Sequence, residues 1–160
     1  RYEANDDLRK AAEPAICAKV ARLSDEMLEF GEPPRDVVIL DAHGNPLKTE
    51  DESRRFFEAA WMHKYKGNYY FSYSTGNTHL ICYAVGDNPY GPFTYRGVIL
   101  TPVVGWTTHH SIVEYQGKWY LFHHDSKLSG GKTWLRSMKV VGLTYHKDGS
   151  IEMIDGSADE

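Results

Sequence analysis

Apolar and polar residues alternate in short runs from Phe56 onward, which is the pattern of half-buried β-strands. Turn-forming residues separate these runs at intervals of about 8 to 12 residues. The predicted strands cover residues 61–65, 69–75, 79–85, 94–100, 110–115, 118–125, 134–145 and 150–154. The first and second, the fifth and sixth, and the last two are close enough to form hairpins. This pattern predicts an all-β fold, which is a sandwich, a barrel or a propeller.

The N-terminal third of the chain is less regular. Residues 16–23 (ICAKVARL) alternate and predict a strand, and residues 36–40 (DVVIL) predict a second. Gly44-Asn45-Pro46 predicts a turn between the second strand and the charged run KTEDESRR, residues 48–55. We expect that charged run to be a solvated surface connection.

A repeat of fifty residues narrows the choice of fold. Aligned at that offset, the first hairpin falls on the second, with the matches Tyr65 on Tyr115, Gly67 on Gly117, Tyr69 on Trp119, Tyr70 on Tyr120 and Phe71 on Leu121. One propeller blade is four strands in about 40 to 50 residues, so the repeat favours a propeller over two merely similar hairpins. The 160 residues then make about three blades, whereas propellers close with at least about four. We expect the missing blades to come from a longer protein or from another copy of the chain.

Composition excludes some classes of function. The formal net charge is −4 and the pI is near 6.1, which argues against a nucleic-acid partner. No apolar run reaches the ~18 residues of a membrane span. The first residues, RYEANDDLRK, contain neither a signal peptide nor an initiator Met, and we expect a piece of a longer protein. Cys17 and Cys82 have no metal-binding spacing; they are either two buried thiols or a pair brought together by folding.

Glu58 is the one carboxylate in the aromatic stretch FFEAAWMHKYKGNYYFSYSTG, residues 56–76. Desolvation against aromatic rings raises the pKa of a carboxyl group, as a general acid near neutral pH requires. The alternative is a strand-edge Glu that points at water, and the pattern taken alone favours that alternative.

Two histidine pairs follow in the second hairpin. His109-His110 opens its first strand, and His123-His124 lies near the end of its second. Neighbouring strand residues point to opposite faces, so neither pair is a two-ligand motif, and the pattern favours structural roles for all four.

Three tryptophans and one arginine are further candidates. Trp61, Trp106 and Trp134 could stack on sugar rings or pack within blades. Arg136 needs a carboxylate partner or a ligand if it is buried. No GxSxG, P-loop, GxGxxG or HExxH motif is present.

The stretches FFEAAWMHKYKGNYYFSYSTG, NPYGPFTYRGVIL, GWTTHHSIVEYQGKWYLFHHD and LSGGKTWLRSMKV, taken in order, resemble glycoside hydrolase family 43. The resemblance runs from about Val20 to Ile154. It implies a five-bladed β-propeller that hydrolyses glycosides with inversion. Residues 1–160 are then the C-terminal part of one catalytic domain, with residues 1–35 ending a preceding blade and 36–160 forming the remaining blades.

The resemblance also implies roles for single residues. Glu58-Ala59-Ala60-Trp61 is similar to the family's E-(G/A)-(P/A/S)-W motif, which makes Glu58 the general acid. Thr108-His109-His110-Ser111 is similar to the family's GH(H/N/G)S motif, which places His109 at the propeller centre beside a hydrated calcium ion. Arg136, Trp61, Trp106 and His110 are then expected to contact substrate. No organic cofactor is expected.

The family's general base, an Asp, and its second Asp lie in the first two blades, which should precede this chain. Asp6, Asp7, Asp25 and Asp36 are in the wrong context to take those roles. We therefore expect an incomplete inverting, exo-acting β-xylosidase or α-L-arabinofuranosidase that is inactive alone and whose partners are pentose-containing saccharides and the missing blades. The alternatives are a non-catalytic carbohydrate-binding fragment and a structural β-repeat protein. Relatives are often periplasmic or secreted, but the sequence leaves localisation open, together with the choice between xylose and arabinose.

Overall fold

The structure is a computed structural model that describes residues 11–106 and 108–158. The described chain is all-β, as predicted, with one turn of 3-10 helix, η2 (Lys127–Ser129). The strands are β1 (Ala18–Val20), β2 (Arg35–Val37), β3 (Ile39–Leu40), β4 (Glu58–Tyr65), β5 (Asn68–Ser74), β6 (Ile81–Gly86), β7 (Phe93–Leu100), β8 (His110–Tyr115), β9 (Lys118–Asp125) and β10 (Ser137–Leu143).

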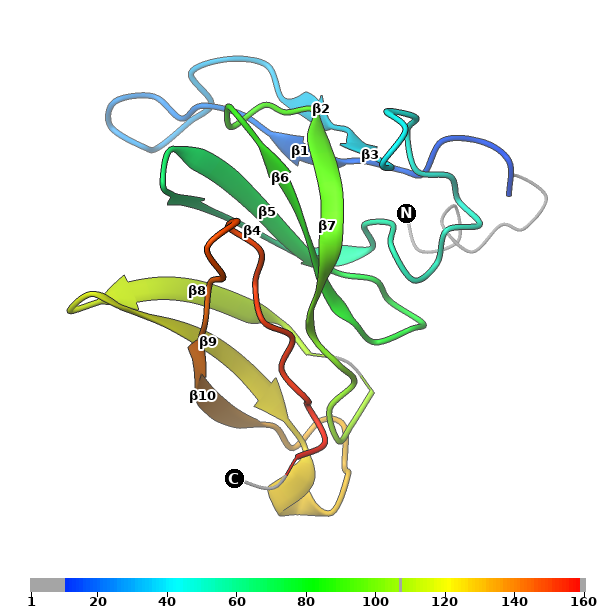
Figure 1. The fold of residues 1–160 in the computed structure, drawn as a ribbon, viewed down its shortest axis with the longest axis vertical. Helices are drawn as coiled ribbons and strands as arrows, with labels where there is room; N and C mark the ends of the chain where they lie inside the picture. Colours follow the sequence, from blue (N-terminus) through cyan, green and yellow to red (C-terminus); the bar gives the residue numbers. More distant parts are fainter. Residues whose placement is uncertain (1–10, 107, 159–160) are drawn as a thin grey trace.

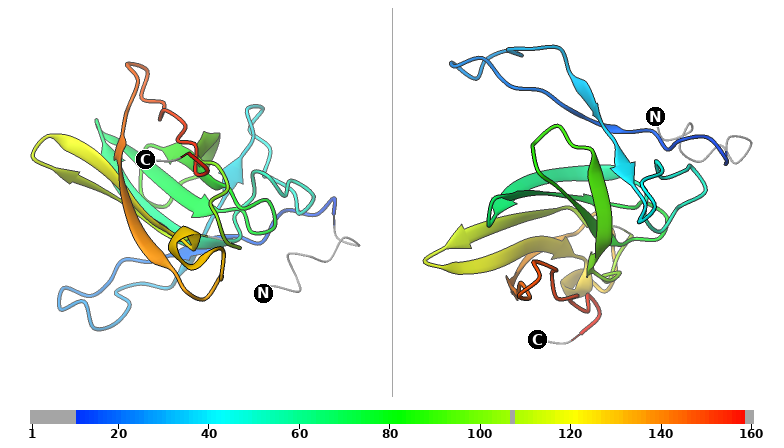
Figure 2. Two further views of the ribbon diagram at one scale, coloured as in Figure 1. Left: turned by 90° about the horizontal axis from the view of Figure 1, so that it is seen from below. Right: turned by 45° about the horizontal axis from the view of Figure 1, so that its top comes forward.

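These strands form three sheets (Figure 1). The largest has the order β3-β7-β6-β5-β4 and is antiparallel except for β3, which runs parallel to β7. The second has the order β10-β9-β8, and β1 and β2 form a separate two-stranded ladder. Strand β8 lies along β4, the faces of the two larger sheets share a core, and both sheets curl (Figure 2). This arrangement is a partial propeller, in which the two larger sheets are successive blades.

The fifty-residue repeat corresponds to two equivalent hairpins. Strands β4 and β5 are joined by Lys66 and Gly67, with φ of 46° and 88°, and β8 and β9 by Gln116 and Gly117, with φ of 50° and 76°. Positive φ at both central residues defines the type I′ turn, whose twist matches that of the flanking strands. Glycine at the second position accepts this conformation without steric cost. The predicted hairpins are therefore confirmed.

The repeat also fixes which face of each sheet packs on its neighbour. Tyr69 and Phe71 of β5 belong to a core shared with the N-terminal segments. The matching residues of β9, Trp119 and Leu121, belong to the core between the two larger sheets. That second core is formed by Tyr70, Ile81, Tyr83, Ile99, Leu100, Val103, Ile112, Leu121, Leu143 and Ile151. Each blade thus turns the same face toward the blade before it.

The opposite face of the β8-β9-β10 sheet is open in this chain. Strand alternation puts Val113 and its partner Tyr120 on this face, because their neighbours Ile112 and Leu121 point into the core. Val113 and Val140 are exposed, and Met138 is 74% exposed. The equivalent face of the preceding blade, which carries Tyr70, is covered by the β8-β9-β10 sheet. The open face is therefore a partly apolar surface that no other sheet of the described chain covers.

The last predicted hairpin is only partly correct. Strand β10 is present, but residues 150–154 form isolated bridges instead of a strand. Tyr145 bridges Ile151, whereas Ile154 bridges Leu100 of the other sheet. The Ile154 N–H donates to the carbonyl of Ile99 at 2.7 Å, and the C-terminal segment thereby ties the two larger sheets together. Local pattern does not specify this pairing, because the partner strand is far away in the sequence.

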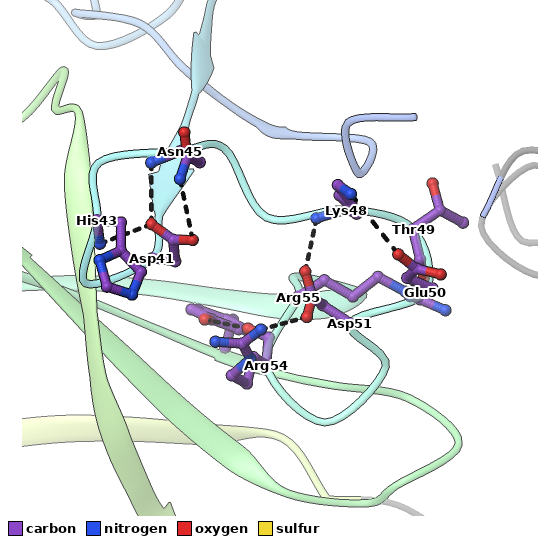
Figure 3. Close-up of polar contacts among 10 residues, drawn as sticks. Asp41, His43, Asn45, Lys48, Thr49, Glu50, Asp51, Arg54 and Arg55 are labelled. Atoms are coloured by element: carbon purple, nitrogen blue, oxygen red, sulfur yellow. Dashed lines mark hydrogen bonds and ion pairs between the residues drawn. The ribbon is translucent and has the colours of Figure 1, made fainter. Parts of the chain in front are cut away.

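The charged run 48–55 is more ordered than predicted (Figure 3). Asp51 accepts the Lys48 N–H at 2.8 Å and pairs with Arg54. Arg55 is only 1% exposed, and its Nε donates to the carbonyl of Thr49 at 2.7 Å. The expectation of a solvated connection is therefore wrong at Arg55, because this backbone carbonyl gives the buried guanidinium a partner.

The structure also bears on the two cysteines and on the question of a membrane-spanning helix. Cys17 and Cys82 form no disulfide with each other, and of the two only Cys82 is fully buried. No helix in the described part of the chain is long and apolar enough to cross a membrane.

Candidate active site

Glu58 is the first residue of β4 and lies beside a β-bulge. It pairs with Ser74 of β5, and the next pair is Trp61 with Ser72, so β4 carries one extra residue between them. Ala59 has a positive φ of 58°, which is uncommon for a residue other than glycine. A bulge re-aims the side chains near it and is common next to active sites. The local backbone therefore turns Glu58 away from a regular strand position.

Glu58 faces His109 across the junction of the two sheets. Its Oε1 lies 3.7 Å from the Nε2 of His109, an electrostatic contact slightly longer than a hydrogen bond. The two side chains are 39% and 53% exposed, respectively. Both groups can thus be reached from solvent while they remain in contact with each other.

A third side chain at this point is His124, for which the sequence favoured a structural role. Its Nε2 accepts the backbone N–H of His109 at 3.1 Å, and the two rings are 6.1 Å apart. Burial, followed by the positive charges of Arg136 and His109, lowers the pKa of His124. The two-residue turn at Gln116-Gly117 was a usable signal, because its register places His109 opposite His124.

Arg136 lies one residue before β10. It is exposed, and its Nε donates to the carbonyl of Thr133 at 2.9 Å. The guanidinium is close enough to His124 to lower that group's pKa. The structure thus brings Glu58, His109, His124 and Arg136 to one end of the two sheets.

His110 and Trp61 point elsewhere. His110 Nε2 is 2.6 Å from the hydroxyl of Ser72 in β5, and burial lowers the pKa of His110 to about 3. The Trp61 Nε1–H donates to the carbonyl of Ile112 at 3.1 Å, and its ring packs against the core between the sheets. The structure therefore places both residues in the contact between the blades, where they hold β5 to β8 and β4 to β8.

Trp106 lies in the loop between β7 and β8. Its ring meets His79 edge-on, with centroids 4.8 Å apart, and the residue is 57% exposed. This loop is fixed to the loop after β9, because the Ser126 N–H donates to the carbonyl of Val104 at 2.8 Å. An exposed indole on an anchored loop is suited to stacking on a sugar ring. Trp134, in the loop before β10, is also largely exposed.

The described residues do not form a calcium cage. Calcium takes about six to eight oxygen ligands in proteins. Within residues 11–106 and 108–158, no group of three or more His, Cys, Asp or Glu side chains could hold a metal ion. His109 offers a single nitrogen donor.

Comparisons with curated proteins give close relatives, although no family model matches the chain. It is 66% identical to a protein of Bacteroides ovatus named xylosidase/arabinosidase, over 98% of this chain and 50% of that protein. It is 61% identical to a β-xylosidase of Xylanibacter ruminicola, over 93% of this chain and 46% of that protein. The chain thus spans about half the length of the curated relatives it matches.

Two solved structures that resemble this chain are also named xylosidases. A family 43 β-xylosidase/α-arabinofuranosidase from a compost metagenome, solved with xylotriose in a calcium-free form, superposes with a TM-score of 0.93 and is 63% identical. That match covers 96% of this chain and 46% of the solved one. The structure of RS223-Beta-xylosidase is 72% identical with a TM-score of 0.89, over 91% of this chain and 45% of that one. Together with the blade arrangement and the Glu58–His109 pair, these matches place the chain in glycoside hydrolase family 43.

Proposed function

We propose that this chain forms the acid-bearing part of an inverting glycosidase that releases pentose units from hemicellulose or arabinan. The observation that carries the proposal is the position of Glu58, held at a bulge and open to solvent 3.7 Å from His109. The 66% identity to a xylosidase/arabinosidase supports the same assignment.

In this proposal Glu58 donates its proton to the glycosidic oxygen as the bond from that oxygen to the anomeric carbon breaks. A water molecule attacks the anomeric carbon from the opposite face and gives its proton to a second carboxylate, the general base. Inverting enzymes hold the two carboxyl groups about 6.5 to 9.5 Å apart, which leaves room for that water. Arg136 and Trp106 contact the sugar, and His109 lies beside the acid.

The general base is assigned to no residue of this chain. Asp36 forms an exposed ion pair with Lys19 in the β1–β2 ladder, and Asp25 lies in an exposed turn. We propose that N-terminal blades of a longer protein pack on the open face that carries Val113 and Met138 and supply the base. A second copy of the chain is the other source of such blades.

The proposed substrates are xylo- and arabino-oligosaccharides. The relatives are named for both sugars, and one solved neighbour holds xylotriose. The calcium-free form of that neighbour supports calcium binding in the family, and His109 is the residue that we propose beside such an ion. No step of the reaction is assigned to the ion.

The test is hydrolysis of unactivated xylo- and arabino-oligosaccharides, whose leaving groups need a proton, by the 160-residue chain and by the complete protein that contains it. Each is compared with its Glu58→Gln variant, and with Glu152→Gln as the matched control, because Glu152 is exposed and remote in the sequence. We expect activity only in the complete protein, its loss in Glu58→Gln and its retention in Glu152→Gln. Full activity of Glu58→Gln would overturn the proposal, and sugar binding without any hydrolysis would leave only the carbohydrate-binding alternative.

A further inference from the structure

The backbone hydrogen-bond pattern between β8 and β9 changes at His109, the residue whose side chain contacts Glu58. The last regular pair is His110 with His123, and the same register places His109 opposite His124. At that next position a side chain takes the role of a backbone carbonyl. The His109 N–H donates to the imidazole Nε2 of His124 at 3.1 Å.

The other strand makes the reciprocal substitution. The N–H of His124 donates to the hydroxyl oxygen of Thr108 at 3.0 Å, and that hydroxyl donates to the carbonyl of His109 at 3.1 Å. Thr108 is only 1% exposed. The backbone of His109 is therefore held on both sides by side chains, at the residue whose ring contacts Glu58.

The His124 ring forms its hydrogen bond to His109 through Nε2. Its Nδ1 is buried and has no hydrogen-bond partner within the described residues. Because Nε2 acts as the acceptor, a neutral ring carries its proton on that Nδ1. Nε2 is therefore the ring nitrogen through which His124 acts on the backbone of His109.

We propose that His124 is a positioning residue for the hydrolysis, which acts by holding the backbone of His109 so that the imidazole of His109 stays beside the carboxyl group of Glu58. This inference rests on the proposed function, since it concerns the same acid. In this proposal the effect of His124 on Glu58 passes through His109.

The alternative is that His124 only caps the end of a hairpin. A cap would affect stability, whereas a positioning residue affects turnover at an unchanged fold. The conservative variant separates the two roles. Glutamine offers an amide oxygen as acceptor at a reach similar to that of imidazole Nε2, whereas leucine fills similar space without an acceptor.

The first test is steady-state kinetics of the complete protein with His124→Leu, His124→Gln and, as control, His146→Leu at an exposed position. We expect kcat of His124→Leu to fall about tenfold with KM changed less than about twofold, because small displacements of catalytic groups are costly. His124→Gln should recover most of that loss. Equal kcat in all variants, or a loss in His124→Leu explained wholly by a lower melting temperature, would overturn the proposal.

The second test needs no activity. Selective 15N-histidine labelling gives an amide signal for His109, identified by its absence in His109→Gln. We expect this signal to shift in His124→Leu and to return toward its original position in His124→Gln. An unmoved signal in His124→Leu contradicts the positioning role, even if Glu58→Gln supports the glycosidase. If Glu58→Gln is fully active but the signal moves as expected, the proposed function fails while the hydrogen bond stands.

Discussion

Two neighbouring histidines, His109 and His110, lie in two different regions of the molecule. His110 points into the contact between the larger sheets, where it bonds Ser72, and His109 points out of it, where it meets Glu58. The residues opposite them divide in the same way, since His124 joins the outer group and His123 is buried. A single step along a strand therefore separates a structural imidazole from one at the candidate site.

The ionisable side chains of the two regions also differ in their burial and in their pKa values. Between the sheets, burial lowers the pKa of His63 to about 4 and that of His110 to about 3. His63 lies against Tyr70 and Trp119, and its Nε2 is 2.5 Å from the hydroxyl of Tyr145. At the strand end, Glu58 and His109 are partly exposed. The inner layer keeps its imidazoles neutral, and the outer end leaves its groups available to a ligand.

The largest expected effect is the sensitivity of the inner layer to acid. A histidine whose pKa is lowered by folding takes up its proton more readily in the unfolded state. Stability is therefore complete above about pH 6.5 and is lost as the pH falls toward the folded pKa. For His63, whose folded pKa is about 4, this loss amounts to roughly 3 kcal/mol at about 1.4 kcal/mol per unit.

Urea unfolding between pH 4.5 and pH 7.5 measures this loss. The free energy of unfolding of His63→Phe should depend less on pH than that of the wild-type chain. His146→Phe, at an exposed position, is the control and should retain the wild-type slope. Identical slopes in all three proteins would mean that burial of His63 does not govern acid stability.

The second effect concerns the bulge at the site. Ala59 has a positive φ of 58°, which a β-branched residue adopts only with strain. Ala59→Val should displace Glu58 and lower kcat about a hundredfold, since misplacement of a catalytic group by about 1 Å has effects of this size. Ala59→Gly accepts positive φ and should retain most activity. The expectation is wrong if valine and glycine give similar kcat values.

The third prediction compares the two adjacent histidines: we expect substitution of His110 to lower stability and substitution of His109 to lower activity. His110→Ala leaves the hydroxyl of Ser72 without its partner and should lower the free energy of unfolding by about 1 to 3 kcal/mol. His109→Ala should change stability by less than about 0.5 kcal/mol, as for most exposed positions, while it lowers kcat. Melting curves and steady-state kinetics on both variants make the comparison. If both variants lose mainly stability, or both lose mainly kcat, the two histidines do not have the different roles described above.

The smallest effect is in the C-terminal segment. The hydroxyl of Tyr70 donates to the carbonyl of Gly149 at 2.7 Å. Tyr70→Phe should lower the free energy of unfolding by about 1 kcal/mol, the typical value of one hydrogen bond, without a change in kcat. Urea midpoints of Tyr70→Phe and of Tyr115→Phe, at an exposed position, provide the measurement and its control. A larger loss in the Tyr115 variant would contradict this assignment.

Several parts of this arrangement could be predicted from the sequence. The type I′ turns at Lys66-Gly67 and Gln116-Gly117 define their hairpins locally, and β8 and β9 have the predicted bounds. The fifty-residue repeat indicated the blades because each copy turns the same face toward its predecessor. Glu58 and His109 were found through a family resemblance, since pattern alone favoured solvated and structural roles for them.

Other features depend on contacts that short patterns do not encode. Nothing in the residues around Ala59 specifies a bulge, and the burial of Arg55 depends on the carbonyl of Thr49. The pairing of Ile154 with Leu100 joins segments far apart in the chain. His124 is different, because the hairpin register places it opposite His109, whereas the positioning role that we propose for it has no signal in the sequence.

The most direct test of Glu58 as the proton donor is the dependence of hydrolysis on the leaving group. Complete protein and its Glu58→Gln variant are compared on aryl xylosides or arabinofuranosides whose phenols range from acidic to weakly acidic, and on an unactivated disaccharide. General acid catalysis contributes about 10²- to 10⁴-fold, so we expect losses of that size on the disaccharide and little loss on the most acidic phenol. The same loss on every substrate would contradict the assignment, because a residue that only shapes the site does not distinguish leaving groups.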